Sequence, residues 1–409
     1  MTVTLDRIEA AAASLAGHIV ETPFRVSRTF SDIFGAEVRL KLENLQFTAS
    51  FKERGAWIRL LDLDEAERRA GVVAVSAGNH AQGVAHVASQ LKIPATIVMP
   101  ISTPVVKIRN TERLGARVVV HGANLSEAEQ FALDMAARDG LTLIHPYDDE
   151  RIIAGQGTIG LEMLREAPDL DALIVPVGGG GLISGIATAA KAVRPDIEVI
   201  GVEAALFPSM HHAIHGLAAP PDAPTIAEGI AVKRPGNLTR PIVERLVDEI
   251  LLVTEAQLER AVQMVLEIEK TVAEGAGAAP IAALLSEGGR FAGKRLGLVV
   301  SGGNIDSRLL ASVLMRGLVG EGRLVRLRME VSDQPGSLAR ITRCIADLGG
   351  DILEVYHQRW FYDVPIKLTE IDVVVETRDA AHMQALIAGL NEAGIPTRAL
   401  SSTAHEVPE

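Results

Sequence analysis

The stretch LIVPVGGGGLISGIATAAKAV, residues Leu173–Val193, decides the fold. Its first five residues form a short apolar run that predicts a buried strand. Four glycines follow, and Ile183–Val193 then continues with the spacing of a helix. A buried strand that passes through a glycine turn into a helix is typical of a parallel sheet with helices on both faces. This stretch therefore predicts an α/β fold.

Short apolar runs alternate with helical patterns on both sides of this stretch. Helical patterns such as Ala81–Leu91 and Ser126–Arg138 separate several of the runs. Aromatic residues make up only 3% of the chain, which suits α/β layers better than an aromatic-rich β-sandwich. Further strands are expected at Val72–Val75, Thr96–Met99, Arg117–Val120, Leu141–Ile144, Val199–Val202 and Leu298–Val300.

Three of the expected strands run directly into polar or glycine-rich loops. The loops are SAGNHAQG (residues 76–83), GGGGL (178–182) and SGGN (301–304). Because ligands of open α/β sheets bind beyond the carboxyl ends of the strands, these loops predict one composite site. Glycine amides at the start of a helix suit an anion such as a phosphate. A tight strand-to-helix turn and a dinucleotide loop are the alternatives for 178–182, although no G-x-x-x-x-G-K-[ST] stretch occurs.

Length, charge and cysteine content bound the possible functions. The 409 residues allow roughly two or three domains. The formal net charge is −12 and no long basic run occurs, which argues against a nucleic-acid partner. Cys344 is the single cysteine, so an intrachain disulfide is excluded and a reducing compartment, the cytoplasm, is expected. No signal peptide and no run of about 20 uncharged apolar residues is found, so no membrane partner is expected.

The pattern changes after a predicted linker at residues 317–323. From Val325 to Val331 apolar and charged residues alternate, as in a half-exposed strand, and a turn and a helical pattern follow. Two further strand-like runs, a second helical pattern and a short strand at Thr397–Leu400 complete the order βαββαβ. Residues 324–409 are therefore expected to form a ferredoxin-like domain.

The segment SFKERGA, residues Ser50–Ala56, resembles the lysine motif of the fold-type II pyridoxal-phosphate (PLP) enzymes, the tryptophan synthase β-like group. With the three loops it makes an ordered set of four motifs at the approximate spacing of that family. The residues from 324 onward resemble an ACT domain, a module that often senses amino acids, and the combined layout is similar to ACT-bearing threonine dehydratases. The resemblance implies a catalytic domain at 1–316, with a large part (1–65 and 150–316) and a small part (66–149).

The resemblance also implies roles for residues of the four motifs. Lys52 becomes the Schiff-base lysine and the catalytic base, since a buried amine with a lowered pKa is the reactive one. Ser76, Asn79 and His80 are expected to bind the substrate carboxylate, and helix capping is the alternative for His80. The implied cofactor-binding residues are Lys52, Phe51, Asn79 at the 3-oxygen, Gly178, Gly179, Gly180, Gly181 and Leu182 at the phosphate, and Ser301 at the pyridine nitrogen.

Two positions favour elimination as the reaction. Ser301 offers a neutral hydroxyl to the pyridine nitrogen, where an Asp would keep the ring protonated and favour other fates of the carbanion. Ala77 stands where the related racemases place a proton-donating serine, so racemase activity is not expected. The expected activity is a PLP-dependent ammonia-lyase that converts L-threonine to 2-oxobutanoate and ammonia, and L-serine to pyruvate. Another β-hydroxy amino acid as substrate, a β-replacement reaction and a non-catalytic amino-acid sensor are the alternatives.

No metal site is expected. Some relatives hold a cation near the position of Glu203 with an acidic residue six positions on, where this chain has Ser209. His211, His212 and His215 have i, i+4 spacing but lack a Glu in an H-E-x-x-H frame, so a surface or interface role is expected for them.

One further residue and the partners complete the expectations. Glu274, in EGAGAA, either supports the cofactor from a distance or caps a helix. The implied effector of the ACT domain is isoleucine or valine, because threonine deamination supplies isoleucine synthesis. The resemblance also implies an allosteric homo-oligomer, a dimer or a tetramer.

Overall fold

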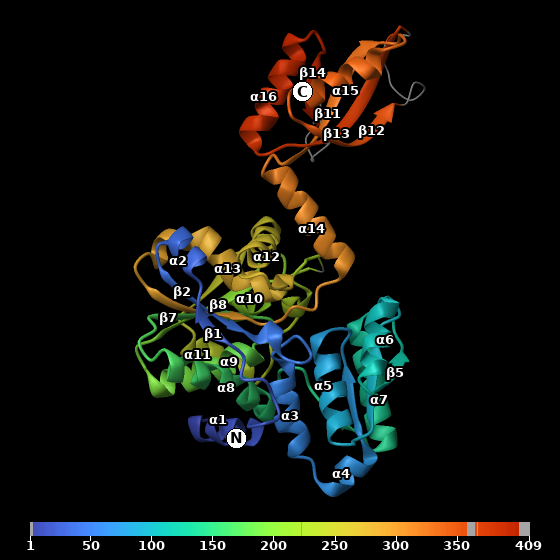
Figure 1. Cartoon of the computed structure of the whole chain (residues 1–409). Helices are drawn as coiled ribbons and strands as arrows, with labels where there is room; N and C mark the ends of the chain where they lie inside the picture. Colours follow the sequence, from blue (N-terminus) through green and yellow to red (C-terminus); the bar gives the residue numbers. More distant parts are fainter. Residues whose placement is uncertain (1–2, 222, 358–364, 366, 401–409) are drawn as a thin grey trace. The chain divides into compact units, whose positions relative to one another are not determined.

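The computed structural model describes residues 3–221, 223–357, 365 and 367–400 of the chain (Figure 1). The chain divides into two compact units, Met1–Asp306 and Ser307–Glu409. The first unit contains a larger and a smaller sheet, both built mainly from parallel strands, and the second contains an antiparallel sheet. The expected α/β fold with a second, antiparallel domain is confirmed.

The larger sheet forms the centre of the first unit. Its elements are β1 Phe24–Val26, β2 Glu37–Leu42, β7 Ala172–Pro176, β8 Glu198–Ala204, β9 Glu249–Val253, β10 Arg295–Val300, α1 Leu5–Leu15, α2 Arg28–Phe34, α3 Lys52–Leu61, α8 Glu150–Glu166, α9 Gly181–Val193, α10 Ser209–Ile214, α11 Thr239–Leu246, α12 Glu255–Glu269 and α13 Gly275–Glu287, with the 3-10 turns η1 Glu43–Leu45, η2 Glu228–Ile230 and η3 Gly288–Phe291. The strand order is β1-β2-β10-β7-β8-β9, and all neighbours are parallel except β1 and β2. Figure 1 shows α12 and α13 on one face of the sheet and α8, α9 and α11 on the other. Helices on both faces bury the central strands, as the apolar runs predict.

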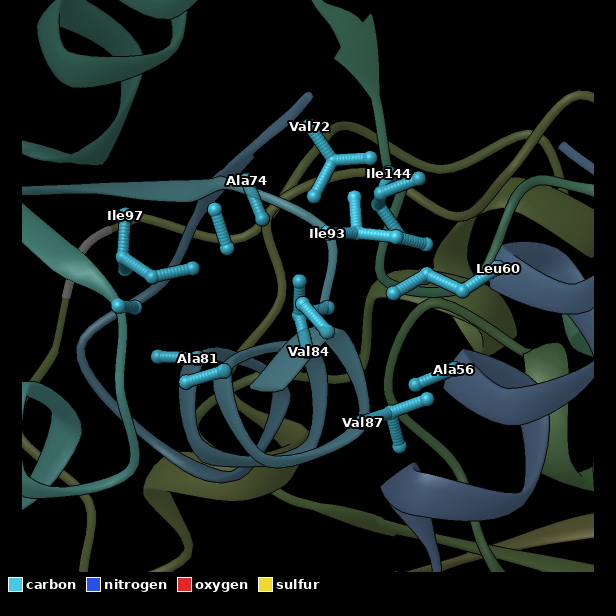
Figure 2. Close-up of a cluster of buried hydrophobic side chains, with 14 of the residues drawn as sticks. Ala56, Leu60, Val72, Ala74, Ala81, Val84, Val87, Ile93, Ile97 and Ile144 are labelled. Atoms are coloured by element: carbon cyan, nitrogen blue, oxygen red, sulfur yellow. The ribbon is translucent and has the colours of Figure 1, made fainter. Parts of the chain in front are cut away.

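The smaller sheet is packed against the helix that begins at Lys52. Its elements are β3 Val72–Val75, β4 Ala95–Met99, β5 Arg117–Val120, β6 Thr142–Leu143, α4 Glu65–Ala70, α5 Asn79–Gln90, α6 Val105–Arg113 and α7 Leu125–Asp139. The strand order is β5-β4-β3-β6, and all pairs are parallel. Figure 2 shows Val84 of α5 and Leu60 of α3 in one buried cluster with Val72 of β3. The core of the smaller sheet therefore fixes the helix that carries Lys52.

Three strands of the larger sheet have no counterpart in the sequence prediction: β1, β2 and β9. β1 and β9 are the edge strands of the sheet, and each has exposed positions that interrupt its apolar run. β2 alternates charged and apolar residues, yet Lys41 at its end is only 1% exposed because Glu162 of α8 pairs with it. Tertiary ion pairing of this kind leaves no mark in the local pattern.

The second unit begins with helix α14 and continues from β11 in the predicted order βαββαβ. Its elements are α14 Ser307–Gly320, β11 Leu324–Ser332, α15 Ser337–Asp347, β12 Asp351–His357, β13 Leu368–Glu376, α16 Ala380–Glu392 and β14 Thr397–Leu400. The strands are antiparallel in the order β12-β13-β11-β14, and apolar side chains of β11, β13, α15 and α16 form the core. The predicted linker at 317–323 overlaps the end of α14, since apolar residues at helical spacing carry this helix to Gly320. Across the described ranges, no helix combines the length and apolar character that a membrane span requires.

Candidate active site

Lys52 begins helix α3 with its amine turned toward the chain segment that follows β6. Its Nζ donates a hydrogen bond to the Pro146 carbonyl oxygen at 2.9 Å and lies 5.1 Å from the centre of the Phe51 ring. Burial lowers the pKa of the Lys52 amine to about 8, with the nearby Glu274 carboxylate opposing the shift. A substantial fraction of this amine is therefore neutral near pH 8, the form that attacks carbonyl groups.

The lysine motif is joined to the loop at the end of β10. Ser50 and Gly302 form an isolated antiparallel bridge, and the Phe51 amide donates to the Ser301 carbonyl oxygen at 3.1 Å. Ala49 adopts a positive φ of 53°, and its carbonyl oxygen accepts from the Gly303 amide at 2.9 Å. Ser301 itself is only 3% exposed. The structure thus brings the SFKERGA and SGGN motifs together, although about 250 residues separate them in the sequence.

Asn79 connects this pair of motifs to Glu274. The Asn79 side-chain amide donates to Oε1 of Glu274 at 2.6 Å, and its Oδ1 accepts from the Asn304 amide at 2.8 Å. Burial raises the pKa of the Glu274 carboxyl to about 7. Gly302 leaves room for this carboxylate, because a Cβ there would lie 2.5 Å from Oε1. Glu274 stands at the N-cap position of α13, but its carboxylate holds Asn79. Of the two expected roles, the structure therefore favours support of the site.

The four glycines form a closely packed turn at the N-terminus of α9. Gly180 has a φ of +91°, a conformation that L side chains rarely adopt. A Cβ on Gly178 would come within 3.0 Å of the Ile230 Cα atom, and one on Gly181 within 2.9 Å of the Tyr147 Cβ atom. Backbone amides at a helix N-terminus bind anions, and glycines let this turn pack against Ile230 and Tyr147 without a clash. Gly178, Gly179, Gly180, Gly181 and Leu182 therefore fit the phosphate of the expected cofactor.

The segment after β6 contributes two contacts that the sequence patterns miss. The Pro146 carbonyl holds the Lys52 amine, and the ring of Tyr147 packs against Gly179 and Gly181. The Tyr147 hydroxyl donates to the Arg234 carbonyl oxygen at 3.0 Å, and burial raises its pKa to about 12. The available signal is the position of His-Pro-Tyr directly after an expected strand, the same position that marks the other three loops.

Ser76 lies in the loop before α5 and His80 in the first turn of that helix, and both side chains contact other residues of the protein. The Ser76 hydroxyl accepts from the Gly78 amide at 3.1 Å and so shapes the turn. The His80 ring is buried, and its Nε2 lies 2.8 Å from the Ile144 carbonyl oxygen. Burial and the Lys52 charge lower the pKa of His80 to about 3, so the ring is neutral and its Nε2–H donates to that carbonyl. The His80 side chain is thus used to contact the chain at the end of β6.

A buried network of charges anchors α3 to its neighbours. The Arg54 guanidinium, two residues after Lys52, donates to both oxygens of Glu43 at 2.8 Å and to the Glu162 carboxylate at 2.6 and 2.9 Å. Lys41 pairs with Glu162 at 2.5 Å and donates to the Thr22 carbonyl oxygen. Burial alone would raise the pKa of the Glu43 carboxyl, but the charges of Arg54 and Lys41 and the hydrogen bonds from Arg54 and Thr22 together outweigh it, so the pKa is lowered. The network ties α3 to β2, η1 and α8.

The carboxylate of Glu203 is used by the start of α10. It accepts from the amides of Met210 and His211 at 2.8 and 2.9 Å, and burial raises its pKa to about 7. The rings of His211 and His215 lie 4.3 Å apart at their centres. In the part of the chain that the structure describes, no three side chains of His, Cys, Asp or Glu are grouped as metal ligands.

The chain is similar to known proteins along most of its length. Residues 15–302 match the family described as pyridoxal-phosphate dependent enzyme. The chain is 44% identical over 386 residues to an L-threonine ammonia-lyase of Thermotoga maritima, with 94% of this chain and 96% of that protein covered. It resembles the processed threonine deaminase isoform 2 of Solanum lycopersicum, with a TM-score of 0.73, 34% identity, and 77% of this chain and 95% of that chain covered. It also resembles maize serine racemase, with a TM-score of 0.72 and 33% identity, and the match covers 78% of this chain and 99% of that chain.

Proposed function

The chain belongs to the family of pyridoxal-phosphate dependent enzymes, and from this premise we propose that it is an L-threonine ammonia-lyase. The substrate loses its Cα proton and its β-hydroxyl, so water leaves. The imine that follows takes up water and releases ammonia, which gives 2-oxobutanoate. L-serine is the second substrate and gives pyruvate. The observation that carries the proposal is the half-buried Lys52 amine, which donates to the Pro146 carbonyl oxygen and has its pKa lowered to about 8, with the Glu274 carboxylate that holds Asn79 nearby.

We assign the cofactor to the residues that the four motifs bring together. Bound PLP supplies an electron sink for the pair of electrons left when the Cα proton is removed. The amides of Gly178–Leu182 would hold its phosphate and Lys52 its aldehyde carbon, with Phe51 beside this lysine. Asn79, oriented by Glu274, would hold the 3-oxygen, and Ser301 would offer its hydroxyl to the pyridine nitrogen. The packed glycine turn and the joined SFKERGA and SGGN loops support this assignment.

Lys52 is the group that moves the substrate proton. A base works best when its pKa lies near the operating pH, and burial has brought this amine to about 8. The Pro146 carbonyl, 2.9 Å from Nζ, fixes the direction of the amine. The segment of Ser76, Asn79 and the His80 amide receives the substrate carboxylate.

Elimination is proposed over racemisation because of Ala77. Alanine cannot donate a proton to the substrate Cα from the face opposite Lys52, and a neutral Ser301 hydroxyl would not keep the ring nitrogen of bound PLP protonated, which would favour loss of the β-hydroxyl. The likeness to a serine racemase structure concerns a fold that both activities share. The residues in the loops therefore decide the reaction.

The second unit is proposed to be a regulatory ACT domain that binds isoleucine or valine. Its antiparallel βαββαβ fold supports this, and Gly336, with a φ of +95°, precedes α15, whose N-terminus suits a carboxylate. An effector shifts activity by binding one state better than another, by typically about 1–3 kcal/mol. A truncation that ends at Gly320 should keep turnover and lose any shift in the saturation curve caused by these amino acids. Calorimetry that detects no amino acid bound by the full chain would refute the regulatory role.

We further propose a homo-oligomer, a dimer or a tetramer, in the cytoplasm, with a role in isoleucine synthesis. The single cysteine supports a reducing compartment. Light scattering on the purified protein measures the oligomer.

The decisive test of the function is a substrate panel with the purified holoenzyme, read as 2-oxo acid formation. L-threonine should give 2-oxobutanoate and an equal amount of ammonia. A new amino acid formed only when sulfide is added would support β-replacement instead. An absence of cofactor absorbance would support a non-catalytic sensor.

A further inference from the structure

An ion pair joins helix α6 of the smaller sheet to the turn η2 of the larger-sheet part. Lys107 lies in the first turn of α6, and its Nζ donates to Oε2 of Glu228, the first residue of η2, at 2.7 Å. The Lys107 side chain is 22% exposed and that of Glu228 is 65% exposed. The pair therefore bridges two parts of the first unit at its surface.

Both ends of this pair adjoin loops of the candidate active site. α6 follows β4, the neighbour of the strand that leads into Ser76, so α6 begins at the same edge of the smaller sheet. η2 lies against the glycine turn and against Glu274. A Cβ on Gly178 would come within 3.0 Å of the Ile230 Cα atom, and one on Gly229 within 3.2 Å of Oε1 of Glu274. Lys107 thus holds, from the smaller-sheet side, the turn that packs on two parts of the site.

The two charges also act on the buried Glu274 in opposite directions. Burial is the main cause that raises the pKa of this carboxyl to about 7, and the Asn79 hydrogen bond opposes it. The Glu228 charge raises this pKa further, and the Lys107 charge lowers it. Because the pair is neutral overall, its effects on Glu274 offset each other while both partners are present.

We propose that Lys107 and Glu228 are positioning residues that hold the smaller-sheet part against η2 around the bound amino-acid substrate. The inference rests on the proposed function, and neither residue touches the reacting atoms. An exposed ion pair adds little to the stability of a fold. A pair that spans the two parts enclosing a ligand instead favours the arrangement that binds the ligand, and so it contributes to ligand affinity. The measurable effect is therefore expected in KM, with kcat little changed.

The test is a charge swap in the holoenzyme. Lys107→Glu and Glu228→Lys each lose the attraction and add a repulsion of similar size, so each should raise KM for L-threonine by about three- to tenfold. The value of kcat should stay within about twofold of the wild type. The double variant Lys107→Glu/Glu228→Lys restores an ion pair and should return KM to within about twofold of the wild-type value.

A matched control is the Lys191–Asp248 pair, which lies wholly in the larger-sheet part. Its N–O distance is 2.8 Å and its lysine is 17% exposed, close to the values for Lys107. Lys191→Glu should therefore leave KM unchanged. If Lys191→Glu raised KM as much as Lys107→Glu does, the positioning role would be overturned. The same holds if KM of the double variant Lys107→Glu/Glu228→Lys were no lower than that of the single variants.

A binding measurement separates this inference from the proposed function. L-alanine has no β-leaving group, and its dissociation constant can be followed through the absorbance of the bound cofactor. The constant should rise in Lys107→Glu by the same factor as KM and recover in the double variant. If the wild type fails to release 2-oxobutanoate from L-threonine, the proposed function fails, while the L-alanine constants still decide whether the pair positions the site.

Discussion

Replacing Gly179 with alanine should weaken cofactor binding while the protein stays folded. A Cβ at this position would lie 2.3–2.4 Å from three ring atoms of Tyr147, whereas carbon atoms pack at roughly 3.5–4.0 Å. The ring is half-buried and its hydroxyl donates to the Arg234 carbonyl oxygen, so it has little freedom to turn away. The glycine turn must therefore shift, and its amides lose their alignment.

The size of the effect follows from the cost of overpacking. An extra methyl group in a well-packed place costs about 1–3 kcal/mol. The free protein can relax the turn, whereas the cofactor-bound protein needs the amides in one arrangement, so most of this cost falls on the bound state. The affinity for PLP should then decrease by about 5- to 150-fold.

The assay is a titration of the apo protein with PLP, followed by absorbance. Gly289→Ala is the control, because a Cβ there has no heavy atom within 4 Å. Tyr147→Ala removes the ring, so the double variant Gly179→Ala/Tyr147→Ala should bind better than Gly179→Ala once the effect of Tyr147→Ala alone is subtracted. Wild-type affinity in Gly179→Ala, or no recovery in the double variant, would show that contact between turn and ring does not limit binding.

Four further outcomes are expected. Lys52→Ala should abolish the lysine-linked absorbance of the cofactor and lower 2-oxo acid formation by at least about a hundredfold; ordinary turnover would exclude Lys52 as the base. The rate at which the apo protein takes up PLP should rise with pH through about 8, since only the neutral Lys52 amine adds to an aldehyde; stopped-flow rates that do not change with pH would contradict this. Ser301→Asp should decrease elimination and increase transamination products in chromatography, and an unchanged product pattern would reduce Ser301 to a turn residue. The wild type should convert L-serine to pyruvate with almost no D-serine, because Ala77 donates no proton; chiral chromatography with comparable amounts of both would refute that reason.

The sequence predicts the strand-end loops well because their chemistry is local. A buried strand, a glycine turn and a helix are adjacent in the chain, so the position of Gly178–Gly181 can be read from one stretch. The same holds for the loop that contains Asn79. What these loops touch cannot be read in this way. The Pro146 carbonyl reaches Lys52 across 94 positions, and a carbonyl group has no residue-type signature.

The prediction for His80 illustrates a second limit. A histidine next to Asn79 suggests a ligand contact, since both residues occupy a loop at the end of a strand. In the structure helix α5 begins at Asn79, so His80 is already on the helix and its ring turns to the Ile144 carbonyl beyond β6. Asn79 and His80 are consecutive residues of this helix, so their side chains leave it in directions about 100° apart.

The charges around α3 explain how Lys52 can be held in place and remain reactive. A single buried cation near Lys52 would lower the pKa of its amine further, and a single buried anion would raise it. The network contains two cations, Lys41 and Arg54, and two anions, Glu43 and Glu162, so its net charge is zero. It fixes the start of α3 through hydrogen bonds of about 2.5–3 Å without a net charge that would act on the amine. The pKa of Lys52 is accordingly set first by burial and then by Glu274, the carboxylate that also holds Asn79. The position and the reactivity of the lysine are therefore controlled by separate groups. Variants of the network should disturb the position of Lys52 before they change its pKa.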